Sequence, residues 1–310
     1  MLTAFELTVA VGERRPSDNA IADSQGGSMK RTIVVTGAAS GIGRATAEIL
    51  EQQGDTVIRV DLEKGDVTGD LGDRDAIVQV AQKIADLSGG RIDGLVANAG
   101  VSAPTPLSPK INYIGTVLLI EALRPLLAES DAPRISVTTS AATLQGNDEK
   151  LVDLLLSGDA EAALARGAEL ASQGPAVGYA NYSSSKRAIS RWIRRVAPTD
   201  DYAGAGIGIN GVGPGQVRTA MTKELFASEE GRKQAATAMP TPFNGPADAE
   251  DIAAVHAFLV SEANSRMTGQ IIFVDGGFDS VSRGDDIWGT ALAISGSLAE
   301  NAKRDRLPDH

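Results

Sequence analysis

Two side chains in the middle of the chain have the types and the spacing for proton transfer. Tyr182 and Lys186 stand four positions apart in the segment Tyr-Ser-Ser-Ser-Lys, which places both on one face of a helix. A free tyrosine titrates at a pH of about 10, and a neighbouring ammonium stabilises the phenolate and lowers that pKa. The pair can then take a proton from an alcohol or give one to a carbonyl. An ordinary surface helix pair has the same spacing, so the interpretation depends on the other motifs.

A glycine-rich turn indicates where an anionic cofactor would bind. Residues 36–43 read Thr-Gly-Ala-Ala-Ser-Gly-Ile-Gly, after a β-branched run and before a helix-like segment. Glycines let backbone amides approach a pyrophosphate, and the first turn of the helix adds unpaired N–H groups. A tight turn without a ligand can look the same, but the order strand, turn and helix favours dinucleotide binding.

Asp61 ends the second strand-like run, 18 positions after Gly43 (61 − 43). An acidic residue at this place is expected to accept hydrogen bonds from the adenosine ribose. A carboxylate about 4 Å from a 2′-phosphate charge would cost roughly 4 kcal/mol at an effective dielectric constant of about 20. We therefore expect NAD rather than NADP as the cofactor. The cationic side chains of Arg44 and Lys64 could weaken that preference. The alternative is a solvated carboxylate at a strand end.

The remaining motifs occur in a specific order, and together they resemble one family. After the glycine turn come Asn98-Ala99-Gly100, then Asn112, Ser140, the Tyr182/Lys186 pair and Pro214-Gly215. This order resembles that of the short-chain dehydrogenase/reductase family, over roughly residues 30–280.

The resemblance implies a role for each catalytic position. Ser140 would hydrogen-bond the substrate oxygen and Tyr182 would be the acid/base. Lys186 would lower the pKa of the tyrosine and hold the nicotinamide ribose, and Asn112 would position a water in the proton relay. Thr139 is an alternative to Ser140.

The resemblance also implies a set of cofactor-binding positions. They span the glycine turn, the second strand end, the Asp-Leu pair and the Asn-Ala-Gly motif, then the acid/base pair and the Pro-Gly turn: Gly37, Ser40, Gly41, Ile42, Gly43, Asp61, Leu62, Asp70, Leu71, Asn98, Ala99, Gly100, Tyr182, Lys186, Pro214, Gly215, Val217 and Thr219. Asn98 has a second interpretation, as a stabiliser of the central sheet. Tyr179 lies near Tyr182 but lacks a lysine four positions later, and we interpret His256 as structural.

The distance between Ser140 and Tyr182 is 42 positions (182 − 140), against about a dozen in many family members. Helix-like segments fill the insertion, at about residues 144–178. This feature resembles the 3α-hydroxysteroid dehydrogenase/carbonyl reductase branch, as do residues 91–96, 61–70 and 274–280. The likeness implies a cyclic or steroid-like secondary alcohol or ketone as substrate. Residues 220–242 resemble the family's substrate-binding loop, and its Met221, Leu225, Phe226 and Met239 suit either a hydrophobic ligand or helix packing.

Alternating elements must position these residues. Strand-like runs at residues 32–36, 56–60, 92–97, 134–139, 207–212 and 270–274 alternate with helix-like segments at 44–53, 73–87, 112–129, 183–196 and 251–260. Strands separated by helices predict a parallel sheet covered on both faces, with ligands at the carboxyl ends of its strands. We expect a single α/β domain of the doubly wound, Rossmann type, with a mostly seven-stranded sheet.

Composition excludes several classes of protein. A net charge of −11 argues against nucleic-acid binding. The chain lacks cysteine, and His256 and His310 are its only histidines, so we expect no metal site. No apolar run reaches about 18 residues, and no secretory signal precedes the first strand, so we expect no membrane partner and a cytoplasmic location. Residues 1–28 are expected to be a disordered leader, 29–280 the catalytic domain, and 281–310 a C-terminal extension in which Trp288, Leu292, Ile294 and Leu298 suggest an apolar element or a frayed tail.

The leading hypothesis is an NAD-dependent oxidoreductase that interconverts a small-molecule secondary alcohol and ketone. The alternatives are a catalytically silent NAD-binding sensor or scaffold, and a lyase or epimerase on the same fold. We expect a homodimer or homotetramer, although the insertion beside Tyr182 could block the usual mode of pairing.

Overall fold

A single parallel sheet organises the protein. The computed structural model describes residues 30–288, so the predictions for residues 1–28 and for Leu292, Ile294, Leu298 and His310 lie outside the described residues. The strands are β1 (Thr32–Thr36), β2 (Thr56–Asp61), β3 (Val67–Thr68), β4 (Gly94–Ala97), β5 (Arg134–Thr138), β6 (Gly208–Pro214) and β7 (Ile271–Val274). Their order is β3-β2-β1-β4-β5-β6-β7, and every pair is parallel. The predicted seven-stranded, doubly wound α/β fold is confirmed.

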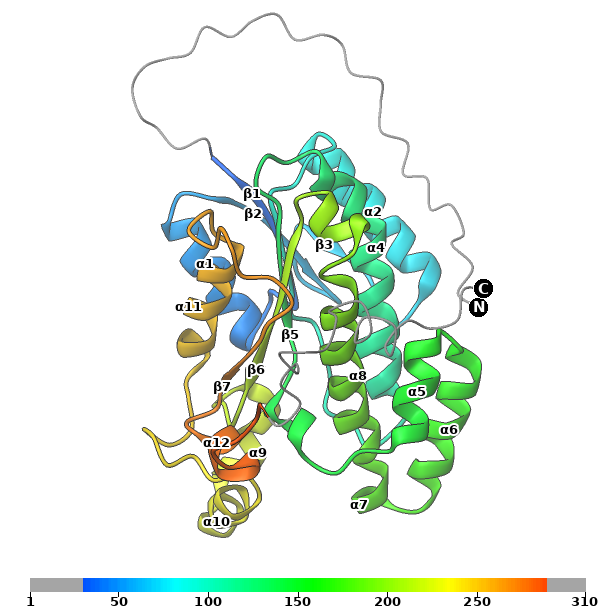
Figure 1. The fold of residues 1–310 in the computed structure, drawn as a ribbon, viewed down its shortest axis with the longest axis vertical. Coiled ribbons are helices and arrows are strands. Elements are labelled where there is room, and N and C mark those ends of the chain that lie inside the picture. The colour runs from blue at the N-terminus through cyan, green and yellow to red at the C-terminus, as the bar shows by residue number, and fades with distance from the viewer. Residues whose placement is uncertain (1–29, 289–310) are drawn as a thin grey trace, which may run out of the picture.

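Helices cover both faces of the sheet. On one face lie α1 (Gly41–Gln52) and α11 (Ala249–Val260), and on the other lie α2 (Arg74–Ser88), α4 (Thr116–Ala128) and α8 (Ala180–Val196). Figure 1 shows the two layers on opposite sides of the strands. The central strand β4 is buried throughout, as expected for a strand covered on both faces. Apolar residues of α1 and α11 form one core with β1, and α2, α4 and α8 form another.

The helical region before β5 differs from its prediction as one helix over residues 112–129. It starts with α3 (Leu107–Pro109), passes through a π-helical turn η1 (Lys110–Gly115) and continues as α4. The stretch Leu107–Ala128 is long and apolar enough to cross a membrane, but 61% of its most apolar window is buried inside the protein. Its apolar composition is therefore explained by packing against the sheet.

The insertion between Ser140 and Tyr182 contains η2 (Ala141–Leu144), α5 (Glu149–Ser157), α6 (Ala160–Ser172) and α7 (Pro175–Gly178). Asp148 and Asp159 cap the amino ends of α5 and α6, since their side chains accept from Leu151 N and Ala162 N. Buried leucines and alanines of α5 and α6 belong to the same core as α4 and α8. The insertion is therefore part of the main packing, on the outer side of α8 (Figure 1).

The remaining elements follow α8 in the chain. They are η3 (Asp200–Gly204), η4 (Ala220–Thr222), α9 (Lys223–Ala227), α10 (Glu229–Ala238) and α12 (Phe278–Arg283). Figure 1 places α9, α10 and α12 together at the end of the sheet where the strands finish. This is the edge at which the fold predicts a ligand.

Candidate active site

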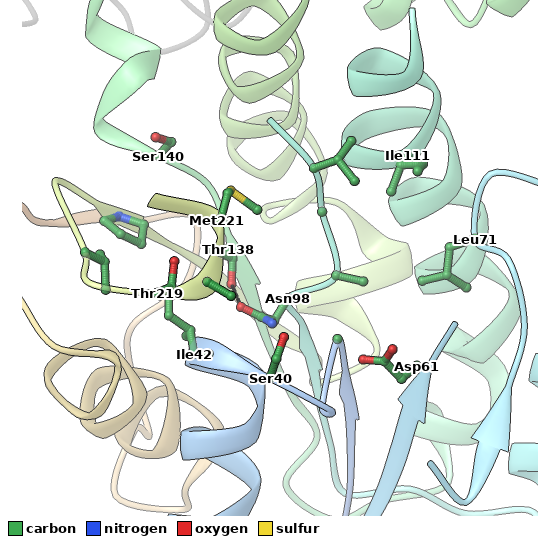
Figure 2. A pocket seen from close by; sticks show the side chains of 18 of the residues that line it. Ser40, Ile42, Asp61, Leu71, Asn98, Ile111, Thr138, Ser140, Thr219 and Met221 are labelled. Atoms are coloured by element: carbon green, nitrogen blue, oxygen red, sulfur yellow. Dashed lines mark hydrogen bonds between the residues drawn. The ribbon is translucent and has the colours of Figure 1, made fainter. Parts of the chain in front are cut away.

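A cleft of about 390 Å³ lies at the carboxyl ends of the strands. It collects residues from the first glycine turn to the substrate-loop region: Gly37, Ser40, Gly41, Ile42, Val60, Asp61, Leu62, Gly69, Asp70, Leu71, Asn98, Ala99, Gly100, Val101, Ile111, Thr138, Thr139, Ser140, Tyr182, Lys186, Pro214, Gly215, Val217, Thr219, Ala220, Met221 and Thr222. Figure 2 shows Asp61 and Leu71 toward one end, Asn98 and Thr138 in the middle, and Ser140 at the other end. The cleft therefore joins the predicted cofactor and chemical ends in one cavity.

Glycines shape the turn between β1 and α1. Gly37 has a φ of +67°, which favours glycine, and a Cβ there would lie 2.9 Å from Asn98 Nδ2. Gly43 is buried behind the turn and does not line the cleft. A Cβ on it would lie 2.1 Å from the Gly37 carbonyl oxygen. Gly43 thus allows close packing of α1 against the turn, and its contact with a pyrophosphate stays a prediction.

The second strand end presents its carboxylate beside this turn. Asp61 Oδ2 accepts from Ala39 N at 3.0 Å and Oδ1 accepts from Leu62 N at 2.8 Å. Two backbone amides therefore fix the carboxylate at the rim of the cleft, where each oxygen retains a free lone pair. Further along, Asp70 Oδ1 accepts from Gly72 N at 2.7 Å, while buried Leu71 contributes an apolar wall.

Asn98 joins three strand ends on the floor of the cleft. It follows β4, its Nδ2 donates to the Thr36 carbonyl oxygen after β1, and its Oδ1 accepts from Thr138 Oγ1 at the end of β5. Its backbone N–H donates to Thr36 Oγ1 at 3.0 Å. These bonds agree with the second interpretation of Asn98, as a stabiliser of the sheet. Asn98 also lines the cleft.

The predicted acid/base residues converge at the other end of the cleft. Tyr182 and Ser140 line the same end of the cleft, close enough for Ser140 to counteract the raised pKa of Tyr182, and Lys186 Nζ lies 6.0 Å from the centre of the Tyr182 ring. Lys186 is 5% exposed and donates to the Thr138 carbonyl oxygen at 2.8 Å. Ser140, which is remote in sequence, and the Tyr182/Lys186 pair therefore lie at one end of the cleft, where a substrate oxygen could bind.

Burial controls the protonation of this group. Desolvation raises the pKa of Tyr182, and the hydrogen bond with Ser140 works against that increase. Burial also lowers the pKa of Lys186 to about 8. The expectation that Lys186 lowers the tyrosine pKa is not seen for the chain alone, because the cost of burying a phenolate is larger than the compensating interactions. At neutral pH the tyrosine is thus protonated and the lysine mostly charged.

Asn112 lies behind the acid/base residues, in the π-helical turn η1. Its Oδ1 accepts from Val101 N at 2.8 Å, and its Nδ2 donates to the Val101 carbonyl oxygen and to Ser185 Oγ. Asn112 does not line the cleft. Its predicted role in positioning a water stays a prediction; the observed contacts join η1 to α8.

Two of the three serines between Tyr182 and Lys186 bind the insertion and the third binds η1, contacts which sequence reasoning did not detect. Ser183 Oγ donates to the Gly146 carbonyl oxygen, and Ser184 Oγ accepts from Asp148 N. Ser185 Oγ donates to the Tyr182 carbonyl oxygen while it accepts from Asn112. All three serines are fully buried. Such a short polar run resembles a solvated surface, so its sequence carries no signal for these contacts.

Most predicted positions line the cleft, and Gly43 and Asn112 do not. Sequence reasoning did not assign a binding role to five other lining residues, namely Val60, Gly69, Val101, Ile111 and Thr138, whereas Ala220 and Thr222 belong to the predicted substrate-binding loop. Of the loop residues suggested for a hydrophobic ligand, Met221 lines the cleft with 59% of its surface exposed, while Leu225 is exposed outside it. Trp288 is also exposed.

The cleft fits a nicotinamide dinucleotide. The amino end of α1 faces the cleft at Ser40 and Gly41, and the Ser40 side chain does not cap the helix. The first amides of α1 are therefore available for a pyrophosphate. Asp61 could accept from the adenosine ribose hydroxyls. Lys186, with one of its three protons on Thr138, could donate to the other ribose.

Comparisons with known proteins agree with this geometry. A model of the short chain dehydrogenase family matches residues 31–152, and a model described as enoyl-(acyl carrier protein) reductase matches residues 160–279. The chain is 31% identical over 257 residues to the 3-alpha-hydroxysteroid dehydrogenase/carbonyl reductase of Comamonas testosteroni, covering 81% of this chain and 97% of the relative. It is 31% identical over 274 residues to the cis-4-hydroxycyclohexanecarboxylate dehydrogenase of Sinomonas cyclohexanicum, covering 81% and 98%.

A solved structure shows the same similarity. The 3-alpha-hydroxysteroid dehydrogenase from Pseudomonas sp. B-0831, in complex with NADH, superposes with a TM-score of 0.73 and 31% identity, covering 82% of this chain and 99% of that one. These matches extend across the insertion and the cleft. The chain belongs to the short-chain dehydrogenase/reductase family, whose members are oxidoreductases that bind NAD or NADP.

Proposed function

We propose that this protein is an NAD-dependent dehydrogenase/reductase that interconverts a secondary alcohol and a ketone, with Tyr182 as its acid/base. One observation carries the proposal: Ser140, Tyr182 and Lys186 line the same cleft as the glycine turn and Asp61. The chemistry that NAD supplies when bound is acceptance of a hydride from, or its return to, the carbon that carries the substrate oxygen.

The side chains of the protein then transfer the proton to or from the substrate oxygen. In the reduction direction, protonated Tyr182 donates its hydroxyl proton to the ketone oxygen as the new C–H bond forms, and Ser140 hydrogen-bonds the same oxygen. In the oxidation direction, the tyrosine phenolate takes the alcohol proton as the C–H bond breaks. Charged Lys186 stabilises the phenolate that exists between these states. The raised pKa of Tyr182 favours its role as a proton donor at neutral pH.

We also propose a hydrophobic, cyclic or steroid-like substrate. Val101, Ile111 and Met221 give the cleft apolar walls, which suit such a ring system. The names of the two relatives above refer to a steroid and to a cyclohexane ring. Asp61 supports NAD over NADP as the cofactor. We further propose that the protein is a cytoplasmic homodimer or homotetramer.

The test is a panel of cyclohexanols, decalols and 3-hydroxysteroids with NAD, followed by the absorbance of the reduced cofactor. Tyr182→Phe should lower kcat by about 100- to 10,000-fold, the usual contribution of a general acid/base, while calorimetry shows unchanged NAD affinity. Tyr179→Phe is the matched control, because its ring lies 5.6 Å from that of Tyr182 but does not line the cleft.

Two results would contradict the proposal. Full turnover in Tyr182→Phe would remove the tyrosine from the reaction. NAD binding without turnover of any alcohol or ketone in the wild type would instead favour the silent sensor.

A further inference from the structure

A buried histidine lies beneath the floor of the cleft. His256 is on α11, on the opposite face of the sheet from Tyr182 and Lys186, and it is 0% exposed. Its Nδ1 lies 2.7 Å from Ser136 Oγ and its Nε2 lies 3.0 Å from Thr138 Oγ1. Because Ser136 and Thr138 are two positions apart on β5, both hydroxyls point to the face that α11 covers.

The partners of Thr138 determine which ring nitrogen carries the proton. Asn98 uses its Nδ2 to donate to Thr36, so its Oδ1 receives the one hydroxyl proton of Thr138. His256 must then donate to Thr138 from Nε2. In a neutral imidazole Nδ1 is the acceptor, and it receives the proton of Ser136. All hydrogen bonds of this series therefore run the same way: Ser136 donates to His256, His256 donates to Thr138, and Thr138 donates to Asn98.

Thr138 connects this series to the reacting group. It is the last residue of β5, and its carbonyl oxygen accepts from Lys186 Nζ at 2.8 Å. Ser140 follows two residues later. The orientation of Thr138 therefore determines where the ammonium of Lys186 is held, and the Thr138 hydroxyl is held from below by His256.

We propose that His256 is a positioning residue for Lys186: its Nε2–H holds the Thr138 hydroxyl, and thereby the carbonyl oxygen that receives the lysine ammonium. The effect of His256 on turnover rests on the proposed function, since it requires that Lys186 serves the reaction. The effect of His256 on Lys186 itself does not.

The charge state of the ring suits this role. Burial, followed by the positive charge of Lys186, lowers the pKa of His256 to about 3. The groups that face the ring are the hydroxyls of Ser136 and Thr138 from β5 and, from across the sheet, the ammonium of Lys186. A neutral imidazole keeps its donor and acceptor sides at every pH at which the lysine titrates, so the position of Thr138 does not change with pH.

The test uses the full chain and four variants. His256→Met removes both polar atoms and keeps the bulk, and His256→Gln keeps a donor near Nε2. Thr138→Val removes the hydroxyl that His256 holds and that donates to Asn98. Thr46→Val is the matched control, because Thr46 is also fully buried, on α1, and its hydroxyl bonds only within that helix, to Ile42.

The first readout is the titration of Lys186 in the protein without cofactor, by NMR of the lysine side chains, with Lys186→Arg to assign the signal. From a wild-type pKa of about 8, loss of a well-oriented carbonyl acceptor should bring the value to about 7 in His256→Met and Thr138→Val. His256→Gln and Thr46→Val should titrate like the wild type. The second readout is kcat/KM at pH 7, which should fall by about tenfold in the first two variants and be restored in His256→Gln.

The outcomes separate the two proposals. Unchanged titration of Lys186 in both His256→Met and Thr138→Val would overturn the positioning role, whatever the turnover. If the titration responds as expected but the wild type turns over no alcohol, the proposed function fails and the positioning role stands. Should His256→Met not fold, Thr138→Val decides, since it changes one hydroxyl in an isosteric side chain.

Discussion

At the scale of single residues, the two ends of the cleft carry different groups: two hydroxyls at one end and a carboxylate at the other. The hydroxyls of Ser140 and Tyr182 lie at one end, whereas Asp61 is held at the other by two backbone amides. Because both amides fix the carboxylate, Asp61 cannot easily swing away from a ligand. A fixed negative charge at this place should discriminate strongly against a second one.

Replacing Asp61 tests that discrimination. We expect Asp61→Asn, which keeps the shape and an amide acceptor, to narrow the ratio of kcat/KM for NAD over NADP by at least about fivefold, since an unfavourable charge contact of roughly 1 to 4 kcal/mol is removed. Steady-state kinetics with both cofactors measure the ratio. Asp66→Asn is the control, because Asp66 also accepts from a backbone amide, that of Arg59, outside the cleft. An unchanged ratio in Asp61→Asn would exclude Asp61 as the source of cofactor preference.

At the scale of elements, the insertion holds the helix that carries Tyr182. Asn181, the residue before the tyrosine, donates from Nδ2 to the carbonyl oxygens of Gly167 on α6 and Gly178 on α7. Arg166 on α6 also binds both oxygens of Asp148, the cap of α5. Its neighbour Gly167 is close to Asn181, because a Cβ on Gly167 would lie 2.3 Å from Asn181 Oδ1.

Gly167→Ala should therefore destabilise the protein although alanine is the better helix former. The gain in helix propensity is about 1 kcal/mol, and forcing a methyl into filled space costs about 1 to 3 kcal/mol. We expect a lower midpoint of urea unfolding and a lower kcat, since Asn181 adjoins Tyr182. Gly146→Ala is the control, because a Cβ there has open space. A Gly167→Ala variant as stable and active as the wild type would show that α6 does not constrain the start of α8.

At the scale of the whole molecule, the cleft is built by elements from both halves of the sheet. Its residues follow β1, β2, β4, β5 and β6 in turn, and one continuous sheet connects them. A ligand that spans the cleft should therefore stabilise the protein as one unit.

Thermal unfolding with and without NAD tests this expectation. At a concentration about 100 times its Kd, NAD should add about 2.7 kcal/mol to the free energy of unfolding. For a chain of this size that corresponds to an increase in Tm of roughly 5 to 10 °C. Calorimetry should show one transition that moves as a whole, and nicotinamide alone, which lacks the adenosine and pyrophosphate groups, should produce a much smaller shift. Two transitions, only one of which responds to NAD, would contradict cooperative binding.

The fold and most of the cleft could be predicted from sequence, for identifiable reasons. The order of strands and helices follows from local apolar patterns, and residues such as Asp61, Ser140 and Tyr182 lie at strand or helix ends that the fold brings to one edge. The contact of Asn112 with Ser185 and the packing of Gly43 beside Asn98 could not be predicted, because each joins residues distant in sequence. The same holds for His256, which we interpreted as structural: its contacts with Ser136 and Thr138 arise from sequence separations of 120 and 118 residues.

The series of hydrogen bonds beneath the floor also determines how a proton can leave the enzyme. Starting from Ser136, it passes through His256 and Thr138 to the side-chain amide of Asn98 and the Thr36 carbonyl oxygen. Neither an amide nor a backbone carbonyl can pass a proton onward. Lys186 meets this series only at a carbonyl oxygen. A proton released by Tyr182 during alcohol oxidation therefore cannot cross the sheet along this series, so the route of its release lies on the cleft side of β5.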